Sequence, residues 1–222
     1  MAAITPTATT PWSTDRLGRR LPQLLFGLWL YGASSGLMVR AGLGVNPWTV
    51  FHQGMQRHFG LSMGTWTTLT GAAVLLLWIP LRQRPGIGTV GNVLILGVAM
   101  DLTLGVVAAP GSWAGRIALL LLGVLLNGLA TGLYIGARLG PGPRDGLMTG
   151  LHRRTGRSLR LMRVSVELTV LAVGILLGGT VGVGTVVYAL AIGPLAQFFL
   201  RWCTVPSGPS ARRPLEKEAR KG

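Results

Sequence analysis

The stretch Ile117–Ala137, IALLLLGVLLNGLATGLYIGA, contains no charged residue. An α-helix rises about 1.5 Å per residue, so about 20 residues cross the roughly 30 Å hydrocarbon core of a bilayer. Five further apolar runs have a similar length: Leu21–Leu43, Leu61–Leu81, Gly86–Ala109, Leu161–Thr180 and Val181–Trp202. The sequence therefore predicts an all-α membrane protein with six transmembrane helices.

The composition of the 222-residue chain agrees with this class. Charged residues make up 12% of the chain, against about 25% in ordinary soluble domains. A large buried core is also apolar, but core helices rarely stay uncharged for about 20 residues in run after run. The runs do not alternate in the way that strands of a membrane β-barrel do.

The distribution of basic residues predicts the orientation in the membrane. The net charge of +15 would suggest nucleic acid in a soluble protein, but here the charges lie in tails and loops. With a cytoplasmic N-terminus, all basic residues except Arg40, Arg57 and Arg116 fall on the cytoplasmic side. The positive-inside rule therefore predicts that both termini are cytoplasmic, and no nucleic-acid partner is expected.

The ends of the chain differ from its membrane part. Residues 1–20 are polar and lack an apolar segment with a cleavage site, so we expect a cytoplasmic tail and no removable signal peptide. Residues 203–222 form a second, basic cytoplasmic tail that we expect to be disordered. Cys203 is the single cysteine, which excludes a disulfide within the chain.

The membrane part repeats itself at a constant offset of 96 residues. Between residues 27 and 101 the register needs no gap, and about a third of the positions are identical, more than shared hydrophobicity explains. The tripeptide Gly88-Thr89-Val90, for example, matches Gly184-Thr185-Val186. Three spans in each repeat, 21–109 and 117–202, would make the second copy inverted, an architecture that many secondary transporters share.

Each repeat contains a small-residue motif and a polar segment, and both predict local structure. The motifs Gly32-x-x-x-Gly36 and Gly128-x-x-x-Gly132 predict close helix packing between the two halves. The segments 46–60 and 142–157 follow the first span of each repeat and are too polar to be full spans. Each is either an amphipathic helix on the membrane surface, with Trp48 on the apolar face of the first, or a half-helix that re-enters the bundle.

These segments also carry a family resemblance. The run Gly42-Leu43-Gly44-Val45-Asn46-Pro47-Trp48-Thr49, with Gly54, resembles the signature of YczE-type membrane proteins, a group that includes YyaS and is related to YitT. The second repeat resembles it in three stretches: Gly140-Pro141-Gly142-Pro143-Arg144-Asp145-Gly146-Leu147-Met148, Gly182-Val183-Gly184-Thr185 and Ile192-Gly193-Pro194-Leu195. The resemblance covers about residues 21–202. It implies a bacterial inner-membrane protein, with some members linked to secondary-metabolite production, and carries over no ligand residues.

Ionisable and amide side chains within spans are costly and so are candidates for a buried substrate or coupling site. Asp101 and Arg40 have similar expected depths, so they could form either a structural ion pair or a coupling site. The repeat places Gln197 at the position equivalent to Asp101. Asn46 and Asn127 complete this group, and Asn127, with Thr131, is expected to make interhelical hydrogen bonds.

A second candidate group lies on the predicted cytoplasmic side. Arg163 and Glu167 are four residues apart and share a helix face, so they form either an interfacial ion pair or a gate that contacts a ligand. Arg144 and Asp145 could join this network, or Asp145 could cap a short helix.

The function predicted from these features is small-molecule transport. It requires a polar cavity between the repeats that Asp101 or Arg40 reaches. The alternative is a non-transporting regulatory or scaffold protein that docks through the arginine-rich loop 138–163, although anionic lipid also explains that loop. No metal spacing, Walker A motif or nucleophile elbow is present, so we expect neither an enzyme nor a cofactor. The expected partners are the bilayer, an unknown small molecule or membrane protein, and a second copy of the chain.

Overall fold

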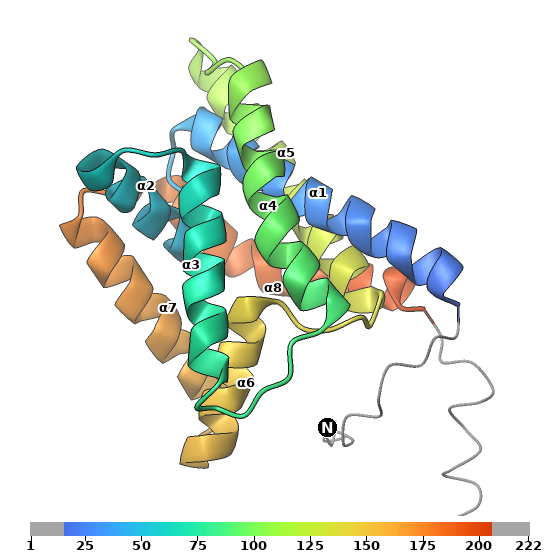
Figure 1. Ribbon diagram of the computed structural model, residues 1–222. Coiled ribbons are helices and arrows are strands. Elements are labelled where there is room, and N and C mark those ends of the chain that lie inside the picture. Colours follow the sequence, from blue (N-terminus) through green and yellow to red (C-terminus); the bar gives the residue numbers. More distant parts are fainter. Residues whose placement is uncertain (1–15, 206–222) are drawn as a thin grey trace, which may run out of the picture.

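Eight α-helices make up the computed structural model, which describes residues 16–205 (Figure 1). Most of the predicted N-terminal tail and nearly all of the C-terminal tail lie outside the described residues. The first helix includes Leu17–Arg20, which the sequence predicts to be part of the tail. The helices are α1 (Leu17–Ala41), α2 (Pro47–Phe59), α3 (Met63–Trp78), α4 (Ile87–Val106), α5 (Trp113–Gly136), α6 (Pro143–Thr155), α7 (Leu159–Leu176) and α8 (Val183–Cys203).

Short polar side chains and prolines set where several helices begin. Ser62, Ser112 and Ser158 precede α3, α5 and α7, and each hydroxyl accepts a hydrogen bond from a first-turn backbone N–H. Such caps satisfy amides that have no partner within the helix. Pro47 and Pro143 are the first residues of α2 and α6, where a missing N–H costs nothing.

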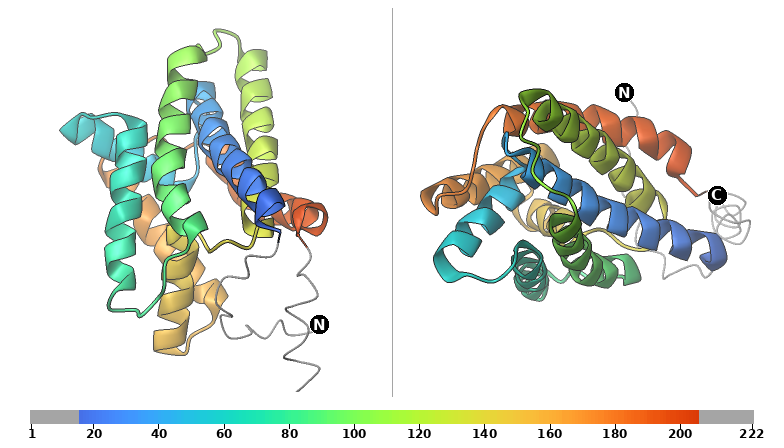
Figure 2. Two further views of the ribbon diagram at one scale, coloured as in Figure 1. Left: turned by 45° about the vertical axis from the view of Figure 1, so that its right-hand side comes forward. Right: turned by 90° about the horizontal axis from the view of Figure 1, so that it is seen from above.

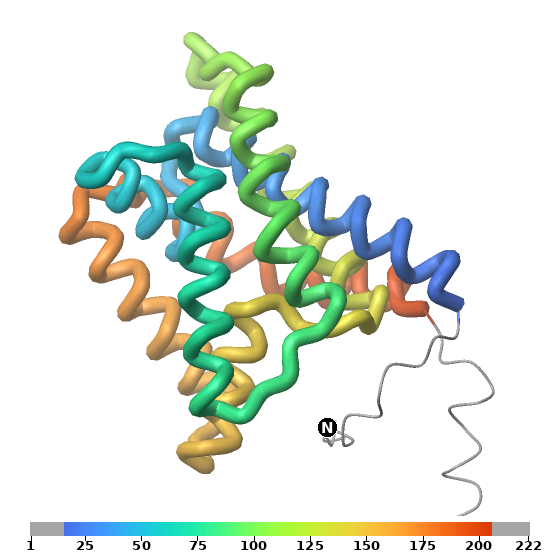
Figure 3. Tube along the Cα trace, in the orientation of Figure 1, coloured from blue at the N-terminus to red at the C-terminus, as the bar shows by residue number. Residues whose placement is uncertain are grey.

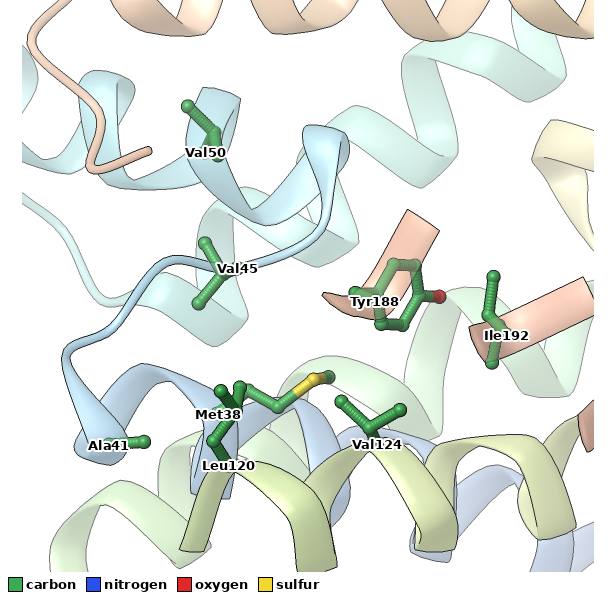
Figure 4. Close-up of a cluster of buried hydrophobic side chains, with 8 residues drawn as sticks. All are labelled: Met38, Ala41, Val45, Val50, Leu120, Val124, Tyr188 and Ile192. Carbon is green, nitrogen blue, oxygen red and sulfur yellow. The ribbon is translucent and has the colours of Figure 1, made fainter. Parts of the chain in front are cut away.

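The helices pack in two groups that share a core. Helix α1 packs along α4 and α5, and α5 packs along α8; to one side, α2 packs on α7 and α3 on α6 (Figure 2). Figure 4 shows one buried cluster at the junction of α1, α2, α5 and α8. Its members are Met38, Ala41, Val45, Val50, Leu120, Val124, Tyr188 and Ile192.

Fewer helices satisfy a simple test for a membrane span than the six that the sequence predicts. Among the described helices, α1, α4, α5 and α8 are long and apolar enough to cross a bilayer, and α2 with α3 would be a fifth span bent by 112°. Helix α3 has 16 residues, and the 18 residues of α7 include Arg160, Arg163 and Glu167. The count of six spans therefore stays a prediction.

The helices of the two halves correspond along the chain. Leu17, Pro47, Met63 and Ile87 begin α1 to α4, and the helices α5 to α8 begin 96 residues after each of them. Contacts between the halves occur in matching pairs. The N–H of Gly88 donates to Leu139 O at 2.8 Å, and the equivalent N–H of Gly184 donates to Leu43 O at 2.7 Å.

The small-residue motifs pack within the halves, which corrects the expectation that they join the halves. A Cβ on Gly32 would lie 2.3 Å from Leu96 O of α4, and one on Gly128 would lie 2.6 Å from Leu195 Cβ of α8. The close approach of α1 to α5 depends on two other glycines of the repeat, Gly27 and Gly123. Glycine spacing predicts a close contact but does not identify the partner helix.

The halves differ in one packing contact. Helix α3 lies along α4 (Figure 3), whereas the equivalent helices α7 and α8 have no comparable contact among the described residues. A Cβ on Gly97 of α4 would lie 2.3 Å from Gly64 O of α3. A Cβ on the equivalent Gly193 of α8 would meet no neighbouring atom within 4 Å among the described residues. One side of the protein is therefore closed where the other is open.

This difference predicts opposite effects of the same substitution at equivalent positions. Gly97→Ala forces a methyl group against the α3 backbone and should lower the free energy of unfolding by about 1–3 kcal/mol. Gly193→Ala meets open space and should be neutral or stabilise α8 by up to about 1 kcal/mol. Unfolding of both purified variants in detergent, followed by tryptophan fluorescence, tests the prediction. Equal losses in the two variants would contradict it.

Candidate functional site

A cavity of about 430 Å³ lies where α2 and α6 begin. Its wall is formed by residues of α1, α4, α5, α7 and α8 together with the first residues of these two short helices. The size falls within the range of about 300–1,000 Å³ that is usual for small-molecule sites. The cavity thus lies between the two halves, but neither Asp101 nor Arg40, one of which the transport prediction required to reach it, lines it.

Both short helices have their N-termini at this cavity. Asn46, Pro47 and Trp48 line it from α2, and Gly142 to Asp145 line it from α6. The first turns are buried, since Trp48 and Pro143 are both buried, whereas the last residues of α2 are exposed. This burial favours the re-entrant alternative for both segments. Burial in α2 also departs from the expected single apolar face, because Thr49 and His52 are buried too.

Arg144 is the charged residue of the cavity whose side chain has the fewest polar partners. Its guanidinium lies over the ring of Trp48, 4.7 Å from the ring centroid. Among the described residues it has no ion-pair or hydrogen-bond partner. The α6 turn that carries it is fixed by Trp78, whose Nε1–H donates to Pro143 O at 3.0 Å and whose ring packs on Gly146.

The three other charged residues of the predicted cytoplasmic network also line this cavity. Arg163 Nε donates to Glu167 Oε1 at 3.1 Å, which is the i,i+4 pair expected from the sequence. Both side chains are partly exposed, so the pair adds little stability. Asp145 does not cap α6; its Oδ2 accepts a hydrogen bond from the Tyr134 hydroxyl at 2.6 Å.

Several polar residues of the wall were missed from the sequence. Asn92, Tyr134 and Tyr188 line the cavity from α4, α5 and α8. Asn92 and Tyr188 are equivalent in the repeat, so two polar residues at one position of an otherwise apolar span were the signal that could have revealed them. Gln197, which was predicted, also lines the cavity and has no hydrogen-bond partner among the described residues.

Asp101 and Arg40 lie away from the cavity and do not pair. The Asp101 carboxylate accepts hydrogen bonds from Gly64 N–H at 2.7 Å and from the Ser62 hydroxyl, so it joins α4 to the start of α3. Arg40 donates to Leu104 O, and its Nε has no partner among the described residues. The ion pair that their similar depth made possible is therefore not formed, because each has a backbone partner nearer to it, and neither residue lines the cavity as a coupling site there would require.

Asn127 makes the expected interhelical hydrogen bonds. Its Nδ2 donates to Ser34 Oγ at 2.9 Å, and its Oδ1 accepts from the Tyr188 hydroxyl at 3.1 Å, which connects α1, α5 and α8. Thr131 instead bonds within α5. Asn46 has a structural role beside the cavity, because its Oδ1 accepts the Thr49 N–H at 3.0 Å and caps α2.

The fold and the cavity together define a polytopic, all-helical membrane protein with two short helices that start at one polar site. Residues 18–201 match a family described as "Family of unknown function (DUF6198)". The chain belongs to this family. No solved structure matches it.

Curated relatives come from bacteria and extend over most of the chain. A protein of Haemophilus influenzae, described as uncharacterized, is 40% identical over 193 residues, 87% of this chain and 88% of the relative. The uncharacterized membrane protein YczE of Bacillus subtilis is 36% identical over 71% of this chain and 74% of its own length. YyaS of the same organism is 25% identical over 78% and 89%. The resemblance to YczE and YyaS is confirmed, and the relation to YitT stays a prediction.

The contacts of Asp101 predict its effect on stability. Asp101→Ala removes two hydrogen bonds, each worth about 0.5–1.5 kcal/mol, and should lower the midpoint of thermal unfolding clearly. Asp101→Asn keeps an oxygen for the Gly64 N–H and should lose less. The unfolding curves of both variants in detergent measure the difference, with Gln197→Ala as the matched change at the equivalent position. A loss in Gln197→Ala as large as in Asp101→Ala would contradict the assignment.

Proposed function

We propose that this protein is a small-molecule transporter with its substrate site in the cavity between the repeats. The observation that carries the proposal is the meeting of two buried helix N-termini, α2 and α6, at one polar cavity of about 430 Å³. Secondary transporters built from inverted repeats bind their substrates at half-helices near the middle of the bilayer. This step from architecture to function is an analogy of fold, supported by the chemistry of the wall.

Equivalent residues that touch each other support a two-fold relation between inverted repeats. Trp48 stacks with its own counterpart, Arg144, and Asn127 Nδ2 donates to the backbone oxygen of its counterpart, Tyr31, at 3.4 Å. Residues related by a two-fold axis can touch only close to that axis. For inverted repeats the axis lies in the membrane plane, so this proposal places Arg144 near the middle of the bilayer.

The open side of the cavity is the cytoplasmic side in this proposal. Glu167 lies in the first half of α7, Gln197 near the end of α8 and Ile135 at the end of α5, and all three line the cavity. Hydrogen bonds join the start of α1 to the ends of α5 and α8 on this side, since Gln23 Nε2 donates to Leu133 O and Cys203 O. The positive-inside rule assigns these ends to the cytoplasm.

The opposite side is closed by the equivalent elements of the first repeat. There the space between α3 and α4 shrinks to a second cavity of about 10 Å³, about the volume that one water molecule needs. Thr67, Thr70 and Gly71 line it from α3, and it adjoins the first cavity, with which it shares Trp48 and Arg144. The closure depends on the Gly64–Gly97 contact and on the hydrogen bonds of Asp101 to the start of α3.

Alternating access would result if the two repeats exchanged conformations, so that the first repeat opened and the second repeat closed. Helix α3 would leave α4 and break the bonds of Asp101, while α7 would close on α8 at Gly193. Gln197, which lacks a partner among the described residues, would then approach Ser158 and the start of α7, as Asp101 now approaches Ser62. The substrate would stay near Arg144 while the access changes side.

Thiol accessibility tests this mechanism without knowledge of the substrate. In a Cys203→Ser background, Ala196→Cys marks the open cavity and Thr70→Cys marks the closed side. A membrane-impermeant maleimide should label Ala196→Cys only from the cytoplasmic face of oriented vesicles, and Thr70→Cys from neither face. Adding Asp101→Ala should expose Thr70→Cys to the periplasmic face and reduce the labelling of Ala196→Cys.

Two outcomes oppose transport. Labelling of both sites from one face, or a pattern that Asp101→Ala leaves unchanged in a folded variant, would contradict alternating access. The regulatory or scaffold alternative would then be favoured, because the basic face that includes Arg153, Arg154 and Arg157 is exposed and available to a partner. Monodisperse elution of each variant in detergent controls for loss of fold.

A further inference from the structure

The substrate class follows from the charges of the cavity, if the proposed transport function holds. We propose that the site takes a small zwitterion, with its carboxylate or similar oxyanion at Arg144 and its protonated amine between Asp145 and Glu167. The shared chemistry fits a free amino acid or an ethanolamine phosphate headgroup. Which end of the zwitterion binds where depends on which charged side chains already have a partner within the protein.

The charges of the wall balance, which disfavours a ligand with one sign of charge. The wall carries two guanidinium groups, of Arg144 and Arg163, and two carboxylates, of Asp145 and Glu167. A simple anion would also meet the two carboxylates, and a simple cation would also meet the two guanidinium groups, so either would be repelled by two of the four charges. A molecule that carries both charges can be oriented so that each end meets its opposite.

The anionic end is assigned to Arg144 because this guanidinium is free to bind. Arg163 donates to Glu167 at 3.1 Å and its side chain is 56% exposed, whereas Arg144 is half-buried and has only the face of Trp48 among the described residues. A guanidinium presents a planar fork of N–H donors that matches a carboxylate or phosphate. The first-turn amides of α6 lie beside it, and helix N-termini favour negative charge.

The cationic end is assigned to carboxylate oxygens that remain available. Asp145 Oδ2 accepts the Tyr134 hydroxyl, which leaves Oδ1 without a partner among the described residues. Glu167 Oε1 accepts a hydrogen bond from the Arg163 Nε–H, so Glu167 Oε2 also has no partner among the described residues. An ammonium group donates three hydrogen bonds and could use both oxygens at once.

The walls limit the rest of the molecule. Tyr31, Tyr134 and Tyr188 surround the charges with aromatic rings, while Ile192 and Leu200 add apolar surface on the α8 side. A cavity of about 430 Å³ is large enough for an amino acid with a sizeable side chain. The aromatic and apolar walls favour a substrate whose body is neutral.

A matched panel of compounds tests the charge requirement directly. The full-length protein in phosphatidylcholine nanodiscs is heated with each of the common amino acids, with the amines that lack the carboxylate, and with the N-acetyl acids that lack the amine. Glycerophosphoethanolamine represents the headgroup. At least one zwitterion should raise the unfolding midpoint, because a ligand that binds only the folded state stabilises it. Its two singly charged analogues should bind at least about tenfold more weakly, since each loses a charged hydrogen bond.

Variants then assign the two ends. Arg144→Gln should weaken the zwitterion about tenfold or more but should not weaken the matching amine, from which it removes a repelling charge, whereas Glu167→Gln should weaken both. Arg153→Gln is the matched control, because Arg153 is exposed on the same helix and does not line the cavity. A response to amino acids identifies a free solute, and a response to glycerophosphoethanolamine alone identifies a lipid headgroup; both support the assignment.

Other results overturn the assignment without deciding transport. Singly charged analogues that bind as well as their zwitterion would overturn it, as would a panel in which no zwitterion raises the midpoint. Equal losses in Arg144→Gln and Arg153→Gln would exclude Arg144 as the anion-binding residue. Because thiol labelling reports access and not ligand binding, alternating access can still be observed when the zwitterion assignment fails.

Discussion

In hydrocarbon every backbone N–H and C=O needs a partner within the protein, and this requirement governs where a membrane chain can break its helices. The described chain breaks between α1 and α2 and again between α5 and α6. At the first break Leu43 O accepts the N–H of Gly184, and at the second Leu139 O accepts the N–H of Gly88. Each break is thus satisfied by the start of a helix from the opposite half. The two halves depend on each other because each supplies the backbone donor for one carbonyl at the other's interruption.

Glycine makes these reciprocal contacts sterically possible. Gly44 and Gly140 have positive φ angles of 107° and 124°, which L side chains rarely adopt. A Cβ on Gly44 would also lie 2.6 Å from the backbone N of Gly182. The chain can therefore turn into α2 and α6 inside the bundle, so that both helices start beside the cavity. The polar site follows from how the breaks are satisfied.

The sequence predicted the features that depend on composition and on local signals. Run length identified the membrane class, and the repeat offset of 96 residues anticipated that each helix has a counterpart in the other half. The prolines at 47 and 143 anticipated where the short helices begin. The grouping of Arg144, Asp145, Arg163 and Glu167 was also anticipated, because all four are charged residues near one predicted end of the spans.

Features that depend on the direction of a side chain were not predictable in this way. Asp101 and Arg40 have similar depths along their helices, yet depth does not say which neighbour a side chain faces, and each found a backbone partner. The same limit hid Asn92 and Tyr188, whose place in the cavity depends on the rotation of α4 and α8. For the same reason the predicted partner of Gly32 was wrong. The spacing of small residues indicates that a helix face packs closely, but it does not indicate which helix packs against that face.

The differences between the repeats explain why the described conformation is open on one side only. Asp101 accepts two hydrogen bonds, one through each carboxyl oxygen, whereas its counterpart Gln197 has a single amide oxygen to offer to the start of α7. Thr67 and Gly71 allow α3 to approach α4 closely, and their counterparts Arg163 and Glu167 would have to be desolvated before α7 could approach α8. A ligand that neutralises those two charges would lower that cost. In the proposed transport mechanism, the residues that differ between the repeats would therefore both favour the described conformation and give a bound ligand a means to change it.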